Sequence, residues 1–153
     1  MRSPRLESDL DSVFPGRLLL GQVLAALLQA HDKALAQFRI TGRQGNALMN
    51  CARGEANTPV ELAMHSALDV SSMSRMLDRL ERKGLIRRAR ARDDRRKVII
   101  SLTPKGRALL DKATPAAARV AAKAWQGVTE GERQTLRDIV RKILGNLGHV
   151  SKS

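Results

Sequence analysis

Residues 58–103 carry the stretch that decides the fold, TPVELAMHSALDVSSMSRMLDRLERKGLIRRARARDDRRKVIISLT. Its beginning marks the start of a helix, because Thr58 can cap the helix and Pro59 suits the first helical position. A glutamate three residues after Thr58 completes a capping box. We expect this helix to be short and to end near residues 64–66, with a turn at residues 67–70.

A longer amphipathic helix is expected after the turn. Its apolar residues recur at i, i+3, i+4 and i+7 and form one inward-facing stripe: Met73, Met76, Leu77 and Leu80. The opposite face is polar and basic: Ser72, Arg75, Arg79 and Arg82. Gly84 is expected to end the helix in the left-handed conformation. Taken alone, the pattern fits either a helix that enters a DNA major groove or an ordinary helix with a solvated cationic face.

The residues after this helix predict a hairpin. Residues 85–89 can form one strand, and Val98, Ile100 and Leu102 alternate with other residues in a second. The loop between them, residues 90–97, is too basic to pack and suits a DNA backbone or a minor groove. The order helix, turn, helix and hairpin predicts a winged helix-turn-helix, and two adjacent basic elements favour a DNA-binding role for both.

The distribution of charge supports a polyanion site in the same stretch. The chain has a formal net charge of +13; residues 1–70 hold 7 basic and 7 acidic side chains, whereas residues 71–107 hold 13 and 4. Residues 71–107 contain no Phe or Trp. The absence of these aromatic rings disfavours membrane anchoring and base stacking with single-stranded nucleic acid, which leaves duplex DNA.

Three segments resemble the DNA-binding core of the MarR family of bacterial transcriptional regulators: TPVELA, LDVSSMSRMLDRLERKGLIRR and DDRRKVIISLTPKGRALL. The most diagnostic part is Asp-Asp-Arg-Arg followed by apolar alternation and Leu-Thr-Pro-x-Gly. The resemblance is close over about 50 residues, and the flanking helices agree with the family in order and length. It implies a homodimeric repressor that is released by a small ligand, often phenolic or an aromatic acid.

The flanking segments are expected to supply dimerisation helices, as the resemblance also implies. A long apolar-rich helix should span residues 14–38, and the helix that begins at Pro104 should be kinked or split by Pro115. A Thr-to-Glu capping box at Thr129 starts a last helix with an apolar stripe. A two-fold dimer places two reading helices about 34 Å apart and predicts an inverted-repeat site.

The predicted fold class is therefore mainly α with a small β-hairpin wing. The predicted domain spans residues 14–148, with a reading head at about 41–103, dimerisation helices at about 14–38 and 104–148, and flexible ends at 1–13 and 149–153.

We assign DNA contacts to two groups of residues. Base readout is expected from the early and exposed positions of the reading helix: Ser71, Ser72, Ser74, Arg75 and Arg79. The wing is expected to act through Arg92, Asp94, Arg95 and Arg96. Within this group, Asp94 either orients Arg96 through an ion pair or is simply solvated.

The resemblance also implies a ligand site. Pro59, Ser74 and Arg88 match positions near one ligand site seen in related members. An arginine there could pair with a carboxylate. Alternatively, Arg88 could be a phosphate contact of the wing strand.

Other functional classes remain as alternatives. A sequence-independent architectural or RNA-binding winged helix is the main one. An enzyme is disfavoured, because His31, His65 and His149 have no motif spacing and no glycine-rich phosphate loop is present. We expect no cofactor or metal.

The single cysteine, Cys51, excludes an intrachain disulfide and a cysteine-based zinc site, and it suits a small buried position. Peroxide-sensing members of the family carry a reactive cysteine near the start of the first long helix, where this sequence has none. A polar N-terminus and the lack of an apolar run of about 18 residues indicate a cytoplasmic protein without a membrane span.

Overall fold

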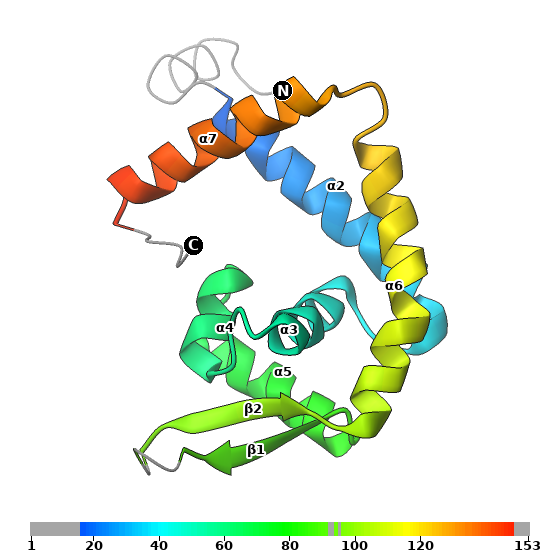
Figure 1. Ribbon diagram of the computed structural model, residues 1–153, viewed down its shortest axis with the longest axis vertical. Coiled ribbons are helices and arrows are strands. Elements are labelled where there is room, and N and C mark those ends of the chain that lie inside the picture. Colours follow the sequence, from blue (N-terminus) through cyan, green and yellow to red (C-terminus); the bar gives the residue numbers. More distant parts are fainter. Residues whose placement is uncertain (1–15, 92–93, 95, 149–153) are drawn as a thin grey trace, which may run out of the picture. The chain divides into compact units, whose positions relative to one another are not determined.

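The computed structural model describes residues 16–91, 94 and 96–148. The chain falls into two compact units, unit 1 up to Val120 and unit 2 from Ala121. The elements in chain order are α2 (Arg17–Leu35), the 3-10 helix η1 (Ala36–Phe38), α3 (Gly42–Arg53), α4 (Pro59–His65), α5 (Val70–Arg82), β1 (Ile86–Arg90), β2 (Val98–Leu102), α6 (Pro104–Ala124) and α7 (Glu130–Asn146) (Figure 1). The mainly α class with one hairpin is confirmed. Within the described residues, no helix is both long and apolar enough to cross a membrane.

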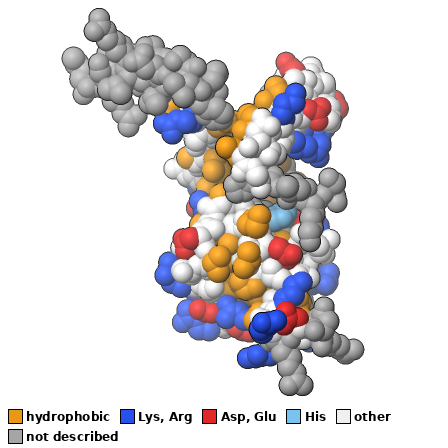
Figure 2. All heavy atoms as spheres, turned by 90° about the vertical axis from the view of Figure 1, so that its left-hand side faces the viewer, with side chains coloured by type: hydrophobic (Ala, Val, Ile, Leu, Met, Phe, Trp, Pro, Cys, Tyr) orange, Lys and Arg blue, Asp and Glu red, His pale blue; other side chains and the backbone are white. Residues whose placement is uncertain are grey.

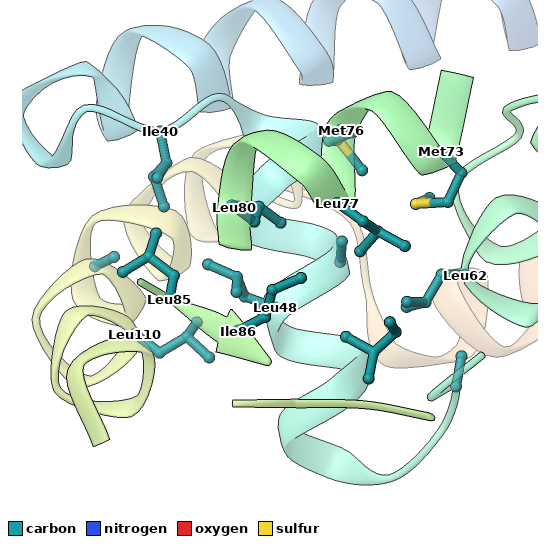
Figure 3. Packing of buried hydrophobic residues seen from close by; sticks show 14 of the residues in the cluster. Ile40, Leu48, Leu62, Met73, Met76, Leu77, Leu80, Leu85, Ile86 and Leu110 are labelled. Atoms are coloured by element: carbon teal, nitrogen blue, oxygen red, sulfur yellow. The ribbon is translucent and has the colours of Figure 1, made fainter. Parts of the chain in front are cut away.

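The core of unit 1 gathers apolar side chains from α3, α4, α5, the hairpin and α6 (Figure 3). The whole predicted stripe of α5 points into it, with Met73, Leu77 and Leu80 fully buried and Met76 nearly so. Leu48 of α3 and Leu62 of α4 are also fully buried. The solvent-facing side of α5 is thereby fixed by the packing of the opposite side.

Predicted capping residues start three of the helices. Thr41 with Gln44, Thr58 with Glu61, and Thr129 with Glu132 all form reciprocal capping boxes. In the second box, the backbone N–H of Asn57 also donates to Glu61 and lowers the pKa of that carboxyl. The carboxylate therefore stays ionised and available to the cap at neutral pH.

The turn before α5 is one residue shorter than the predicted 67–70. Asp69 is the N-cap of α5, and its Oδ1 accepts a hydrogen bond from the Ser72 N–H at 2.8 Å, so Val70 is already helical. Sequence analysis predicted the turn but did not identify Asp69 as the N-cap of α5.

The end of α5 explains why the first strand begins at Ile86 and not at the predicted Leu85. Gly84 has φ of 70°, as expected for a left-handed helix end, and its N–H donates to the Glu81 carbonyl. The Leu85 N–H donates to the Leu80 carbonyl at 3.0 Å, which completes a Schellman motif. Leu85 is therefore still bonded to the helix when the strand starts.

The hairpin is antiparallel, with Ile86 opposite Leu102, Arg88 opposite Ile100 and Arg90 opposite Val98. It is also tied to the loop before α4, because the Ile100 N–H donates to the Asn57 carbonyl at 2.7 Å.

Two predictions about the flanking helices are corrected. The first long helix occupies Arg17–Leu35 with η1 after it, which is shorter than the expected 14–38, and residues 14 and 15 lie outside the described residues. Of the two outcomes predicted at Pro115, the split is wrong, because α6 runs unbroken through it, and the kink stays a prediction. Pro115 and Asp111 are both exposed, so the Asp111 carbonyl that loses its helix partner can be solvated.

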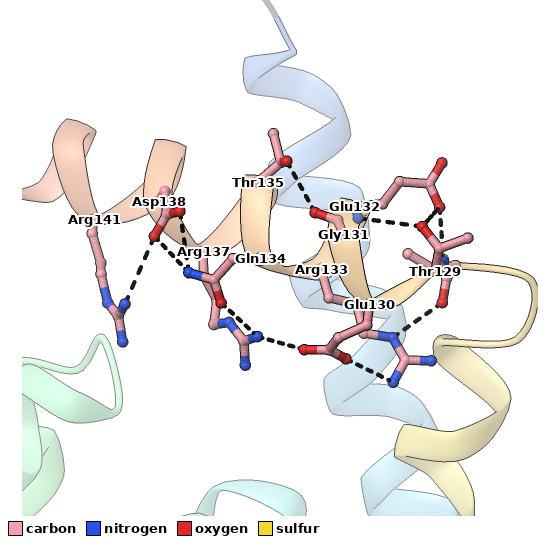
Figure 4. Close-up of polar contacts among 11 residues, drawn as sticks. Thr129, Glu130, Gly131, Glu132, Arg133, Gln134, Thr135, Arg137, Asp138 and Arg141 are labelled. Atoms are coloured by element: carbon pink, nitrogen blue, oxygen red, sulfur yellow. Dashed lines mark hydrogen bonds and ion pairs between the residues drawn. The ribbon is translucent and has the colours of Figure 1, made fainter.

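Unit 2 contains an amphipathic helix, α7. Its polar side carries a network that includes Arg137 with Glu130 at 2.8 Å and Gln134 with Asp138 at 2.9 Å (Figure 4). None of its described residues is buried. Several large apolar side chains of α7 and its C-cap are exposed: Leu136, Ile139, Leu144 and the C-cap Leu147.

Candidate nucleic-acid interface

The first turn of α5 holds a chain of polar contacts that leads to a candidate base-reading side chain. Nη2 of Arg75 donates to Oγ of Ser72 at 3.0 Å, and Ser72 in turn bonds to the cap, Asp69. Hydrogen bonding with Ser72, first through the side chain and then through the backbone, lowers the pKa of Asp69. Arg75 is therefore oriented along the exposed surface of α5 by the residues that start the helix.

The five predicted reading positions differ in exposure. Ser71, Arg75 and Arg79 are exposed, whereas Ser72 and Ser74 are half-buried. The Ser74 carbonyl accepts a hydrogen bond from Nη2 of Arg88 at 3.2 Å, so Ser74 lies on the side of α5 that faces the hairpin. The three exposed residues form the most accessible part of the predicted reading surface.

The described part of the wing loop contains the predicted ion pair. Oδ1 of Asp94 accepts from the Arg96 N–H at 2.9 Å and lies 3.5 Å from Nε of Arg96. The Arg96 side chain is 95% exposed. Arg92 and Arg95 lie outside the described residues. Lys and Arg side chains gather around the hairpin in the view of Figure 2.

Arg88 joins the wing to the reading helix. Its Nη1 lies 2.6 Å from Oδ1 of Asp78 and 3.6 Å from Oε2 of Glu81, and its backbone N–H also donates to Glu81. Its Nε is buried and has no hydrogen-bond partner among the described residues. Sequence analysis did not predict these contacts of Arg88 with Asp78 and Glu81, which lie three residues apart on one face of α5.

A separate cavity of about 340 Å³ lies within unit 1. Its walls are mostly apolar side chains from α2, α3 and α6: Leu24, Leu27, Leu28, Leu35, Met49, Leu110, Ala113 and Ala117. The polar groups that line it include His31, Arg43, His65 and Ser66. The predicted ligand residues Pro59, Ser74 and Arg88 do not line this cavity.

Other reactive groups offer little chemistry. Cys51 was expected to fill a small buried position, and the structure shows it half-buried. Burial raises the pKa of its thiol to about 11. Across the described ranges, no group of three or more His, Cys, Asp or Glu side chains is placed to hold a metal ion.

Comparison with known proteins decides the family. The family model described as MarR family matches residues 40–98. The multiple antibiotic resistance protein MarR of Salmonella typhimurium is 31% identical over 130 residues, which cover 82% of this chain and 90% of that protein. The chain belongs to the MarR family. The predicted resemblance is confirmed.

Two solved structures resemble the fold of this chain. A cysteine-to-serine mutant of MarR from E. coli, complexed with operator DNA, has a TM-score of 0.75 and 27% identity, and the match covers 88% of this chain and 96% of that one. CouR from Rhodococcus jostii RHA1, bound to p-coumaroyl-CoA, has a TM-score of 0.74 and 28% identity, with 82% and 88% covered. The winged helix-turn-helix assignment of α4, α5 and the hairpin agrees with both.

Proposed function

We propose that this MarR-family protein is a homodimeric transcriptional repressor that binds an inverted-repeat operator in duplex DNA. The observation that carries the proposal is the surface of α5, where Ser71, Arg75 and Arg79 are exposed on a helix whose other side is locked into the core. Arginine can read guanine edges through two hydrogen bonds in the major groove. Arg96, held at its base by Asp94, is free to reach the DNA backbone.

The relative bound to operator DNA supports the same use of the fold here. In this reading, α5 enters the major groove and the wing lies beside it. Ser72 and Ser74 contribute at the edges of the contact, and Arg92 and Arg95 extend the basic wing.

Exposed apolar faces support the dimer. On α2, Leu19 is 64% exposed and Val23 is 56% exposed, and on α7, Ile139 is 52% exposed. Removing such side chains from water is worth roughly 25 cal/mol for each Å² of apolar surface. A second copy of the chain is the partner that a two-fold operator requires.

Release by a small phenolic or aromatic acid is part of the proposal. The structure of CouR was solved with p-coumaroyl-CoA bound, which supports ligand binding by a protein of this fold. Ligand binding at Pro59, Ser74 and Arg88 stays a prediction. Because Arg88 already contacts two carboxylates, we favour the apolar cavity of unit 1 as the ligand site.

The test is operator binding by fluorescence anisotropy over a range of salt concentrations. Arg96→Ala should weaken binding to all duplexes and reduce the salt slope by about one unit. Arg75→Ala should instead relax preference at particular base pairs, by about 1–3 kcal/mol each. Arg53→Ala, an exposed arginine on α3, is the control. A uniform loss of affinity in Arg75→Ala would show that Arg75 contacts only the backbone.

A further inference from the structure

One arginine connects α3 to the turn of the helix-turn-helix. Arg43, in the first turn of α3, donates from Nη1 to the Ser66 carbonyl at 2.8 Å. Ser66 is the C-cap of α4, where main-chain carbonyls lack helical partners and a cation is favourable. Ala67, next to it, has φ of 48°, which is uncommon for a residue other than glycine. We call the Arg43–Ser66 hydrogen bond the clasp, because it holds this turn in place.

The clasp lies in the wall of the apolar cavity. Arg43, Ser66 and Ala67 all line it, together with His31 and His65. No Asp or Glu is among the residues that line the cavity. Its polar corner is therefore rich in hydrogen-bond donors and lacks a negative charge to balance the guanidinium.

Ser66 has a second feature that points to a ligand. It is only 8% exposed, and its Oγ is buried without a hydrogen-bond partner among the described residues. A buried hydroxyl without a partner is costly, and such groups in native structures call for a specific explanation. A carboxylate in the cavity would give this hydroxyl an acceptor.

We propose that Arg43 is the switch residue of ligand release: a small aromatic carboxylate in the cavity draws its guanidinium away from the Ser66 carbonyl and opens the clasp. This inference rests on the proposed function. A carboxylate outcompetes a neutral carbonyl, because hydrogen bonds between charged partners are about twice as strong. The ring packs on the leucines of the cavity, and the Ser66 hydroxyl donates to the second carboxylate oxygen.

The position of the clasp explains how the ligand affects DNA binding. The turn that it holds joins α4 to the cap of α5, so opening it changes the direction in which the reading helix leaves the turn. A ligand that favours the open state lowers operator affinity by its preference for that state. At about 340 Å³, the cavity is near the small end of ligand pockets and suits a single ring.

The experiment uses benzoate as the probe and benzamide as its uncharged counterpart, with the full chain. Two readouts are compared: operator affinity by anisotropy and thermal denaturation without DNA. We expect benzoate to lower operator affinity by about fivefold or more and to raise the melting temperature, with little effect of benzamide. Equal effects of the acid and the amide, or no effect of benzoate on either readout, would overturn the proposal.

Substitutions at Arg43 and Ser66 distinguish the effect of the clasp on operator binding from ligand binding in the cavity. Arg43→Gln should bind the operator several-fold more weakly without benzoate and should no longer respond to benzoate. Ser66→Ala should bind benzoate about tenfold more weakly, as measured by the melting temperature without DNA, because it loses a hydrogen bond to a charged group. Arg53→Gln, on the exposed side of the same helix, is the control and should match the wild type.

Two outcomes in the variants would contradict the clasp. Normal operator affinity in Arg43→Gln would mean that the clasp does not hold the turn, and a normal benzoate response would mean that Arg43 does not sense the acid. Circular dichroism checks the fold, and Arg43→Lys, which keeps the charge, replaces the variant if it unfolds. Failure to find any operator would count against the proposed function, whereas the melting-temperature comparison tests benzoate binding independently of DNA.

Discussion

Gly106 gives a physical reason for the Leu-Thr-Pro-x-Gly motif. A Cβ at this position would overlap the carbonyl oxygen of Leu85 and would lie 3.3 Å from Cδ2 of Leu102. Thr103 closes the same corner, because its Oγ1 donates to the Gly84 carbonyl at 2.6 Å and accepts from the Gly106 N–H at 3.0 Å. The first turn of α6 is therefore packed directly on the base of the wing.

Gly106→Ala should lower the free energy of unfolding by about 1–3 kcal/mol, because the backbone of Leu85 must move to admit the methyl group. Urea denaturation measures the change. The control is Gly145→Ala in α7, where a Cβ meets nothing within 4 Å and alanine should stabilise the helix by up to about 1 kcal/mol. Equal effects of the two substitutions would show that residue 106 does not need glycine.

The thiol of Cys51 should react slowly at neutral pH. Burial raises its pKa to about 11, so the nucleophilic thiolate is scarce at pH 7 and should increase steadily as the pH approaches 11. The rate of alkylation by iodoacetamide across this pH range measures the reactivity of the thiol, with the urea-unfolded chain as the reference. Fast alkylation with a plateau near pH 8 would mean that the side chain is not buried.

At the scale of elements, the helix ends that depend on a few neighbouring residues were predictable from the sequence. The capping boxes at Thr41, Thr58 and Thr129 and the left-handed Gly84 each depend on a few adjacent residues, and all are present. Strand and turn boundaries shifted by one residue, because Leu85 and Asp69 make capping hydrogen bonds that a hydrophobic pattern does not reveal.

The connections between elements were not predictable in the same way. The Arg88–Asp78 pair and the Arg43–Ser66 clasp join residues from separate elements. The family resemblance marked Arg88 as a candidate ligand residue, but only the packing of the hairpin on α5 shows which carboxylates it meets. Arg43 carried no signal beyond its place in the first turn of α3.

Arg88→Met should weaken operator binding several-fold while base preference is retained. The reason is that the wing loses the ion pairs of Arg88 with Asp78 and Glu81 of the reading helix. The loss of stability should be about 1 kcal/mol or less, since Asp78 and Glu81 are partly exposed and their pairing is screened by solvent. Binding to the selected operator and to single-base variants measures both effects. Arg87→Met, an exposed neighbour in β1, is the control, and equal losses in the two variants would contradict this role of Arg88.

At the scale of the whole molecule, the apolar faces of α2 and α7 carry the dimer proposal. The sequence analysis expected dimerisation helices on both flanks, from an apolar-rich first helix and an apolar stripe on the last one. The structure leaves large apolar side chains of both helices exposed. The predicted division into a reading head at 41–103 and dimerisation helices on either side stays a prediction.

Ile139→Asp should shift the chain toward a monomer and weaken operator binding, because it places a charge in the proposed apolar interface. Analytical ultracentrifugation over a range of protein concentrations measures the association. Arg141→Asp is the matched control, since Arg141 lies on the polar side of the same helix and is also exposed. A dimer of unchanged strength in Ile139→Asp would place the interface elsewhere.

The central claim is that this MarR-family chain reads a specific two-fold sequence in duplex DNA. The most direct measurement is selection from a random duplex library at near-physiological salt, followed by sequencing of the bound pool. The account predicts an enriched inverted repeat with half-sites about ten base pairs apart, as two reading helices one duplex turn apart require. Salt-sensitive binding without any enriched sequence would contradict it and would favour a sequence-independent architectural protein.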